Sequence, residues 1–432
     1  MKKLSIFSFL GSAIAVVALS ACTNSSSEDS SQIAEQEVSV KKLDDYLYQV
    51  EYDDYNFDSI ANVINESFAP PKAACSQVRK GNFIARNFDW YINQDASAIV
   101  RVKGNSERFA SVGVSGAYPM FGQVDGKLDT AENALGQLMF YTVDGINEKG
   151  VYVGANVAPT GETSKDKSKW EPYTWGVGAA YTNPKSKTHY NVLVLARYIL
   201  DYASSVDDAI EKIEAIDWFE PYNFDSGIYP QSFHWIIADR TKNVVIEFID
   251  NKLECLLTDK VEEPSLATIM TNFSNVLMAD SKQQKKDSPI QYMAAGLERY
   301  DILFDNYDKA EISFKGMENL IKKVWYSHVF TDSVQSKNFL FTEYVGAENA
   351  DGEEIYRAEE LYKNKELAND SAFASIVEHA HGLFADKSNW HVPDTKLWYT
   401  THSVVYNLET RNFEIILHEG FDGIKDWLKV EF

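Results

Sequence analysis

The spacing of apolar residues changes several times along the chain, and each change predicts a different kind of element. Apolar residues three or four apart predict helices at 190–203, 206–216, 289–305 and 313–325, and a short helical region within 40–70. Ser205 stands directly before the second of these stretches and predicts its N-cap. The predicted helices therefore form separate groups along the chain.

Short runs rich in β-branched and aromatic residues predict strands between the helices. They cover residues 82–85, 96–102, 109–114, 137–143, 151–157, 233–238, 244–249, 253–257, 268–271, 396–406 and 412–418. The order along the chain is strands, helices, strands, helices, strands. This order predicts two layers of sheet covered by helices in one domain.

The N-terminus has the pattern of an export signal rather than of a folded element. Lys2 and Lys3 precede an apolar run at 4–19, and the run ends in Leu-Ser-Ala before Cys22. This ending resembles a bacterial lipobox. Residues 1–21 are therefore predicted to be a signal peptide and Cys22 the lipidated residue. The alternative is an ordinary signal peptide followed by a cysteine that occurs there by chance.

Residues 23–36 are rich in serine and acid and predict a flexible tether after Cys22. No later stretch is apolar and long enough to span a bilayer. The sequence thus predicts a protein of the bacterial cell envelope that is attached to the membrane by a lipid anchor.

Composition and charge exclude several classes of protein. A hydrophobic fraction of 45% is too high for a disordered chain. With 64 acidic against 41 basic residues, the net charge is −23, which argues against a nucleic-acid partner. Three cysteines, at 22, 75 and 255, are too few for a disulfide framework. Cys255, within an apolar run, is predicted to be a buried strand cysteine.

Cys75 follows two alanines and opens a strand-like stretch. Cutting the bond between Ala74 and Cys75 would leave a thiol and a free α-amine on one residue, which is a nucleophile beside a base. Such an amine titrates near pH ~8, so it can be neutral at working pH. Arg86 and Asp89 could fold back on Cys75 after a turn, where arginine favours the thiolate and aspartate orients the amine. The alternative is an isolated, buried cysteine that only packs.

Five motifs in the same order resemble the N-terminal nucleophile (Ntn) linear amide C–N hydrolases of the choloylglycine hydrolase family, which contains bile salt hydrolases and penicillin V acylases. Cys75 is followed by ARNFDW at 85–90, DGINEKG at 144–150, FHWIIAD at 233–239 with VVIE at 244–247, TN at 271–272 and LERY at 297–300. The resemblance runs from Cys75 to the C-terminus.

The resemblance implies an α+β fold, the four-layer αββα Ntn-hydrolase sandwich, as a single catalytic domain at 75–432. Residues 22–74 would then be a lipidated tether and propeptide. Cleavage before Cys75 would separate the anchor from the enzyme, unless the propeptide stays bound. The enzyme would accordingly remain lipid-anchored or be released into the periplasm or the extracellular space.

The resemblance also implies roles for six side chains. Cys75 would be the nucleophile, with its α-amine as base. Arg86 would lie beside the thiol, Asp89 would bind the amine, and Asn272 would donate its side-chain N–H to the oxyanion. The remaining two assignments are an arginine that stabilises the network and an asparagine after the NEKG turn. The arginine is Arg299. The asparagine is Asn156, although the aligned position is Val157, so Asn156 or Val157 could supply the second oxyanion donor.

Some positions depart from the family pattern. Ser76 replaces the usual threonine of bile salt hydrolases, and the family's T-N-x-P lacks its proline here. These differences weaken the case for bile salts in particular. The substrate is expected to be a small N-acyl amide, such as a conjugated bile salt, penicillin V, or an N-acyl amino acid or lipid. Relatives often form oligomers, so a homo-oligomer is allowed.

Neither a cofactor nor a metal is expected, because His379 and His381 lack a third ligand motif. Two other functions stay open at this point. Nine tryptophans and many tyrosines would suit a non-catalytic, ligand-binding envelope lipoprotein on the same fold. Eight histidines would allow a Cys–His peptidase, although no paired motif supports one.

Overall fold

The computed structural model describes the greater part of the chain in thirteen stretches. They are residues 15–18, 37–44, 47–65, 74–91, 97–115, 138–159, 181–219, 231–249, 251–280, 297–330, 341–345, 396–417 and 426–432. Cys22, His379 and His381 lie outside them. The lipidation of Cys22 therefore stays a prediction.

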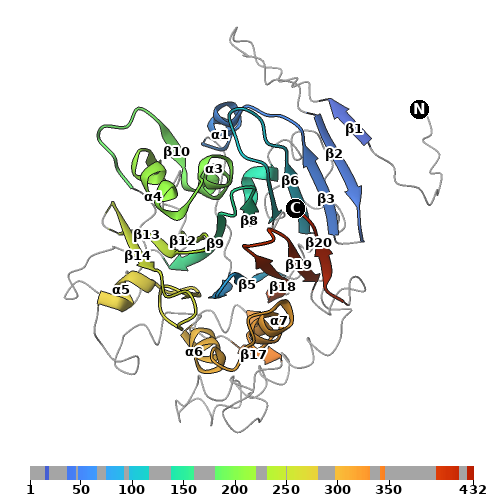
Figure 1. Ribbon diagram of the computed structural model, residues 1–432, viewed down its shortest axis with the longest axis vertical. Helices are drawn as coiled ribbons and strands as arrows, with labels where there is room; N and C mark the ends of the chain where they lie inside the picture. The colour runs from blue at the N-terminus through green and yellow to red at the C-terminus, as the bar shows by residue number, and fades with distance from the viewer. Residues whose placement is uncertain are drawn as a thin grey trace, which may run out of the picture.

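Two large sheets dominate the described residues (Figure 1). The first has the strand order β1 (Ala15–Ala18), β2 (Glu37–Lys42), β3 (Leu47–Tyr52), β6 (Ser97–Val102), β7 (Ser111–Ser115), β8 (Thr142–Asn147), β9 (Tyr152–Pro159), β12 (Gln231–Ala238), β13 (Asn243–Ile249) and β14 (Lys252–Thr258). Its strands pair antiparallel except β3 and β6, which run parallel.

The second sheet contains the strand that begins near Cys75. Its order is β15 (Ile269–Met270), β4 (Ala74–Lys80), β5 (Phe83–Tyr91), β18 (Lys396–Asn407), β16 (Trp325–Phe330) and β17 (Phe341–Val345), with β19 (Phe413–Leu417) and β20 (Leu428–Val430) joined to β18. A separate parallel pair consists of β10 (His189–Asn191) and β11 (Asp217–Phe219).

Helices cover the outer faces of both sheets. They are α1 (Phe57–Asn65), α3 (Leu195–Tyr202), α4 (Val206–Glu214), α5 (Asn275–Asp280), α6 (Leu297–Asn306) and α7 (Phe314–Lys322), with the short 3-10 turns Met139–Tyr141 and Val192–Val194. Ser205 caps α4, because its hydroxyl accepts from the Asp208 N–H at 3.1 Å, as predicted. Ser313 caps α7 in the same way.

Three buried hydrophobic clusters alternate with the two sheets. The first packs α1, α3 and α4 against the first sheet, the second fills the space between the sheets, and the third packs α6 and α7 against the second sheet. Figure 1 shows α3 and α4 beside one sheet and α6 and α7 beside the other. This order of layers confirms the predicted α+β, αββα sandwich.

The elements before Cys75 belong to the same core. Leu47, Val50 and Tyr52 of β3 are fully buried, and the Tyr55 hydroxyl donates to the buried Asp201 carboxylate. The α1 side chain of Phe57 packs in the first cluster. The proposed boundary between propeptide and catalytic domain is therefore not a boundary in the packing.

One prediction about these elements is confirmed and one is wrong. The short helical region predicted within 40–70 is α1, at 57–65, whereas residues up to 52 pair as β2 and β3 with each other and with β6. Cys255 lies in the predicted strand but is exposed rather than buried. The reason is that β14 is an edge strand. Strand β1, inside the predicted signal peptide, pairs with β2 in the full chain.

Candidate active site

A tight hairpin brings Cys75, Arg86 and Asp89 together. The turn between β4 and β5 contains Gly81, whose φ of +59° is easily adopted only without a side chain. The resulting register places Cys75 opposite Phe88 and Ala74 opposite Asp89. Since side chains alternate across a strand, Cys75 and Arg86 face the first sheet, whereas Asp89 faces the helical layer. The hairpin thus places both charged residues next to Cys75, but only Arg86 has its side chain on the face of the thiol.

Arg86 is the cation beside the thiol. Its Nη2 lies 3.5 Å from the Cys75 Sγ and donates to the Ala155 carbonyl at 2.6 Å, and its Nη1 forms a buried ion pair with Asp144. Burial raises the pKa of the Cys75 thiol, and the charge of Arg86 opposes that rise. Arginine at this position therefore favours the thiolate in a site that water does not reach.

Asp144 holds Arg86 in place and was not predicted as a site residue. It also accepts a hydrogen bond from the Tyr406 hydroxyl. Asp144 begins the DGINEKG motif, which was the signal in the sequence, but nothing in the motif's spacing says that its carboxylate meets Arg86.

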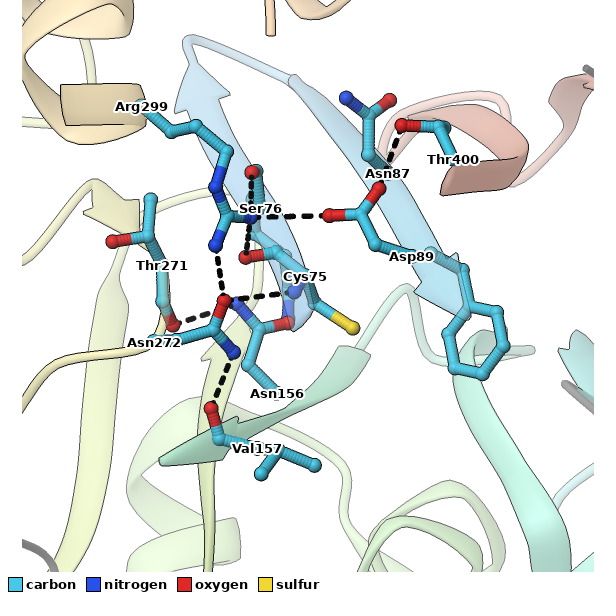
Figure 2. A network of polar contacts seen from close by, with 12 residues as sticks. Cys75, Ser76, Asn87, Asp89, Asn156, Val157, Thr271, Asn272, Arg299 and Thr400 are labelled. Carbon is cyan, nitrogen blue, oxygen red and sulfur yellow. Dashed lines mark hydrogen bonds and ion pairs between the residues drawn. The ribbon is translucent and has the colours of Figure 1, made fainter. Parts of the chain in front are cut away.

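Arg299, from α6, binds several groups around Cys75. Its Nη1 donates to the Cys75 carbonyl at 2.7 Å and the Ser76 hydroxyl at 2.8 Å, and it lies 3.1 Å from Asp89 Oδ2. Its Nη2 donates to the Asn272 side-chain oxygen. Figure 2 shows the guanidinium between Asp89 and Asn272, above Cys75. Arg299 thus joins the nucleophile strand to the two other polar site residues.

The Asp89 carboxylate is buried and has two partners. It pairs with Arg299 and accepts from the Thr400 hydroxyl at 2.6 Å. Burial raises the pKa of Asp89 to about 7, although Arg299 and Thr400 both act in the opposite direction. In the uncut chain Asp89 therefore holds Arg299. The backbone N–H of Cys75 instead donates to the Asn272 Oδ1 at 2.9 Å.

Asn272 lies directly beside the nucleophile. While its oxygen accepts from Cys75 and Arg299, its Nδ2 donates to the Val157 carbonyl (Figure 2). A side-chain amide carries two N–H donors, so binding Val157 occupies one of them. The Val157 side chain packs against Cys75 and Phe88. Asn272 is thus near enough to the thiol for the predicted oxyanion role.

The structure distinguishes Asn156 from Val157. The Asn156 side chain accepts from Gln77 at 2.7 Å and donates to the carbonyls of Met270 and Thr271 at 3.3 and 3.1 Å. Asn156 therefore contacts the main chain next to Asn272 and does not point at the thiol. Val157, the aligned position, is the one of the two whose side chain contacts Cys75.

A buried histidine near Arg86 was also missed by the sequence. His402 stacks on Phe88 with ring centroids 5.1 Å apart, and its Nδ1 lies 2.9 Å from the Ser97 hydroxyl. Burial and the charge of Arg86 lower its pKa well below the usual value. Within the described stretches no histidine is hydrogen-bonded to Cys75, so this geometry gives the Cys–His peptidase alternative no support.

The described stretches contain neither a cluster of metal ligands nor a membrane-spanning helix. No group of three or more His, Cys, Asp or Glu side chains there is arranged to hold a metal ion. No helix among the described residues is long and apolar enough to cross a membrane.

Comparison with known proteins points to one family. The model of the linear amide C–N hydrolases, choloylglycine hydrolase family, matches residues 75–283. No curated protein matches the chain. A mutant of the conjugated bile acid hydrolase from Clostridium perfringens is 14% identical, with a TM-score of 0.36 over 83% of this chain and 92% of that one. The penicillin V acylase from Agrobacterium tumefaciens is 14% identical, with a TM-score of 0.33 over 79% and 82%.

The matched residues begin at Cys75 and include Arg86, Asp89 and Asn272, which the fold brings together. Through residues 75–283, this chain is therefore similar to the linear amide C–N hydrolases of the choloylglycine hydrolase family, which is a family of amidohydrolases.

Proposed function

We propose that the enzyme hydrolyses the C–N bond of a small N-acyl amide through a thioester on Cys75. The observation that carries this proposal is the set of groups around the buried Cys75 thiol. Arg86 lies 3.5 Å from the Cys75 sulfur, and the Asn272 side chain accepts a hydrogen bond from the Cys75 backbone N–H. A cation beside a thiol and an amide donor beside the reacting centre are what acyl transfer requires.

The base in this proposal exists only after the chain is cut before Cys75. In the uncut chain the nitrogen of Cys75 is an amide and donates to Asn272, so it has no lone pair for a proton. Cleavage of the Ala74–Cys75 bond frees an α-amine with an ordinary pKa near ~8. Asp89 lies opposite Ala74 in the hairpin, so the new amine, once it is no longer bonded to Ala74, can turn toward this carboxylate.

The chemical steps then follow in order. The neutral amine takes the thiol proton, and the thiolate attacks the substrate carbonyl to give a tetrahedral oxyanion. The free N–H of Asn272 and a backbone N–H near Val157 stabilise that charge. The C–N bond breaks as the leaving amine receives the proton, and water hydrolyses the thioester to release the acid and restore the thiol.

Maturation leaves the N-terminal segment in place. The same thiol would attack the carbonyl of Ala74, the C–N bond to Cys75 would break as the α-amine is freed, and water would hydrolyse the resulting thioester, so that no other protease is needed. Because Leu47, Val50 and Phe57 lie in the cores of the sandwich, the cut piece stays bound. A lipid on Cys22 would then keep the mature enzyme at the bacterial cell envelope.

The substrate is proposed at the level of its class. The solved relatives are named for conjugated bile acids and penicillin V, and both of these compounds are linear N-acyl amides. An N-acyl amino acid or lipid contains the same bond. The departures at Ser76 and after Asn272 favour testing all three kinds.

The test is hydrolysis of a panel of these amides by the full chain and by two cysteine variants. Cys75→Ala is expected to remove measurable hydrolysis of every compound, because no other group supplies the thioester. Cys255→Ala, on the exposed edge strand, is the matched control and should keep the parent rate. Turnover by folded Cys75→Ala would refute the proposal.

A further inference from the structure

Two motif residues on β12 and β13 take no part in the proposed acyl transfer, yet both are fully buried. The His234 Nδ1 lies 3.0 Å from the Glu247 Oε1, and neither side chain is exposed. Burying an imidazole and a carboxylate requires that their polar atoms find partners. Their remaining contacts all go to one segment of the chain.

That segment is the stretch that carries Asn272. Before Asn272, the His234 Nε2 donates to the Thr271 carbonyl at 2.8 Å. Asn156 donates to the same oxygen (Figure 2). After Asn272, Glu247 accepts from the Ser274 hydroxyl at 2.5 Å and from the backbone N–H groups of residues 275 and 276 at 2.7 and 3.2 Å. The main chain is thus held on both sides of Asn272.

The three side chains that hold the main chain around Asn272 come from neighbouring strands. His234 is in register with Asn156 on β9, and the register of β12 with β13 brings it beside Glu247. We call these three residues the Asn156–His234–Glu247 row. A row on three central strands is more rigid than the loop between β15 and α5 that it holds.

Donor and acceptor roles in the row follow from its partners. The Thr271 carbonyl has only lone pairs, so the His234 Nε2 must carry a hydrogen. A glutamine at 247 cannot replace the carboxylate, because its NH₂ group would face the donors of the 274–276 main chain and hydroxyl.

We propose that the Asn156–His234–Glu247 row positions Asn272 as an oxyanion donor, which makes His234 and Glu247 positioning residues of the hydrolase. The inference depends on the function proposed for Asn272. A side-chain donor stabilises the oxyanion only within a few tenths of an ångström of its productive place. By holding the main chain on both sides of Asn272, the row fixes the position of this loop residue.

The first test compares His234→Gln and Glu247→Gln with a matched pair. His189 and Asp217 form the same kind of contact, 2.7 Å between Nδ1 and a carboxylate oxygen, on the surface. His234→Gln and Glu247→Gln are expected to lower kcat by ~10–100-fold with KM within ~3-fold, the size of a misplaced transition-state donor. His189→Gln and Asp217→Asn should leave both constants at parent values.

A double-mutant cycle separates positioning from general damage. In an Asn272→Ala background there is no side-chain donor left to position, so His234→Gln should lower kcat by less than ~3-fold further. Losses that multiply would overturn the proposal, because they would mean that His234 acts independently of Asn272. A parent-like kcat in a folded Glu247→Gln variant would overturn it as well.

Two further measurements cover the remaining cases. If thermal unfolding shows that the His234 and Glu247 variants do not fold, Ser274→Ala removes one contact of Glu247 and should still lower kcat without changing KM. If the parent hydrolyses no amide, the proposed function fails instead. Crystal structures of the parent and Glu247→Gln then decide the positioning claim, and an unmoved Asn272 amide would refute it.

Discussion

The reactivity of Cys75 depends on opposing effects at a single sulfur. Burial raises the pKa of its thiol, the charge of Arg86 lowers it, and the charge of Asp89 raises it. The ion pair with Asp144 keeps Arg86 at the distance where it acts. The site therefore keeps a thiol protected from solvent while leaving one cation to favour the thiolate.

Replacing Arg86 by glutamine should make the thiol less acidic. An opposite charge within ~4–6 Å shifts a pKa by ~1–3 units, so the pH profile of Cys75 alkylation should move upward by ~1 unit or more. The rate of modification by iodoacetamide, measured against pH in a Cys255→Ala background, reports this. Arg240→Gln, at an exposed side chain, should leave the profile in place. A downward shift for Arg86→Gln would contradict the assignment.

Asp89 should make stability depend on pH. Its pKa is raised to about 7, so between about pH 4 and pH 7 the folded chain holds a proton that the unfolded chain releases. The contribution of Asp89 to stability is thus present at low pH and lost as the pH rises through 7. Asp89→Asn should gain stability relative to the parent between pH 5 and pH 8, measured by urea unfolding. A constant difference over this pH range would count against it.

At the scale of elements, the segment 37–65 behaves as part of the sandwich. Strand β3 pairs with β6 along its whole length, and the Arg108 guanidinium donates to the Tyr55 carbonyl at 2.7 Å while pairing with Asp54. Removing these elements would expose the edge of β6 and part of the first hydrophobic cluster.

The cut N-terminal piece should therefore remain with the rest of the chain. After cleavage before Cys75, size-exclusion chromatography under native conditions should give one peak that contains both pieces. A denaturing gel of that peak should separate them. A native peak that lacks the N-terminal piece would contradict the packing argument.

Elements with local signals could be predicted from the sequence. The Ser205 cap, the strands from 231 to 258 and the pair formed by β18 and β19 are all close to the predicted ranges. The exact place of the short helix within 40–70 could not be predicted, because the spacing of Leu43, Leu47 and Val50 fits a helix as well as a strand. Pairing with β6, fifty residues later, decided between them.

At the scale of the whole molecule, the candidate site joins both sheets and a helix layer. Cys75 and Arg86 come from the second sheet, Val157 from the first, and Arg299 from α6. Motifs could predict which residue types gather there. They could not predict where Asn156 points, because that depends on which face of β9 packs against the 270–271 main chain.

The central claim is that Cys75 becomes an N-terminal nucleophile by cutting its own chain. The most direct test is the intact mass and N-terminal sequence of the purified full chain and of Cys75→Ala, both produced in a bacterial host. The account predicts a piece that starts at Cys75 in the parent and an uncut chain in the variant. A parent that stays uncut yet hydrolyses amides, or a variant cut at the same bond, would contradict it.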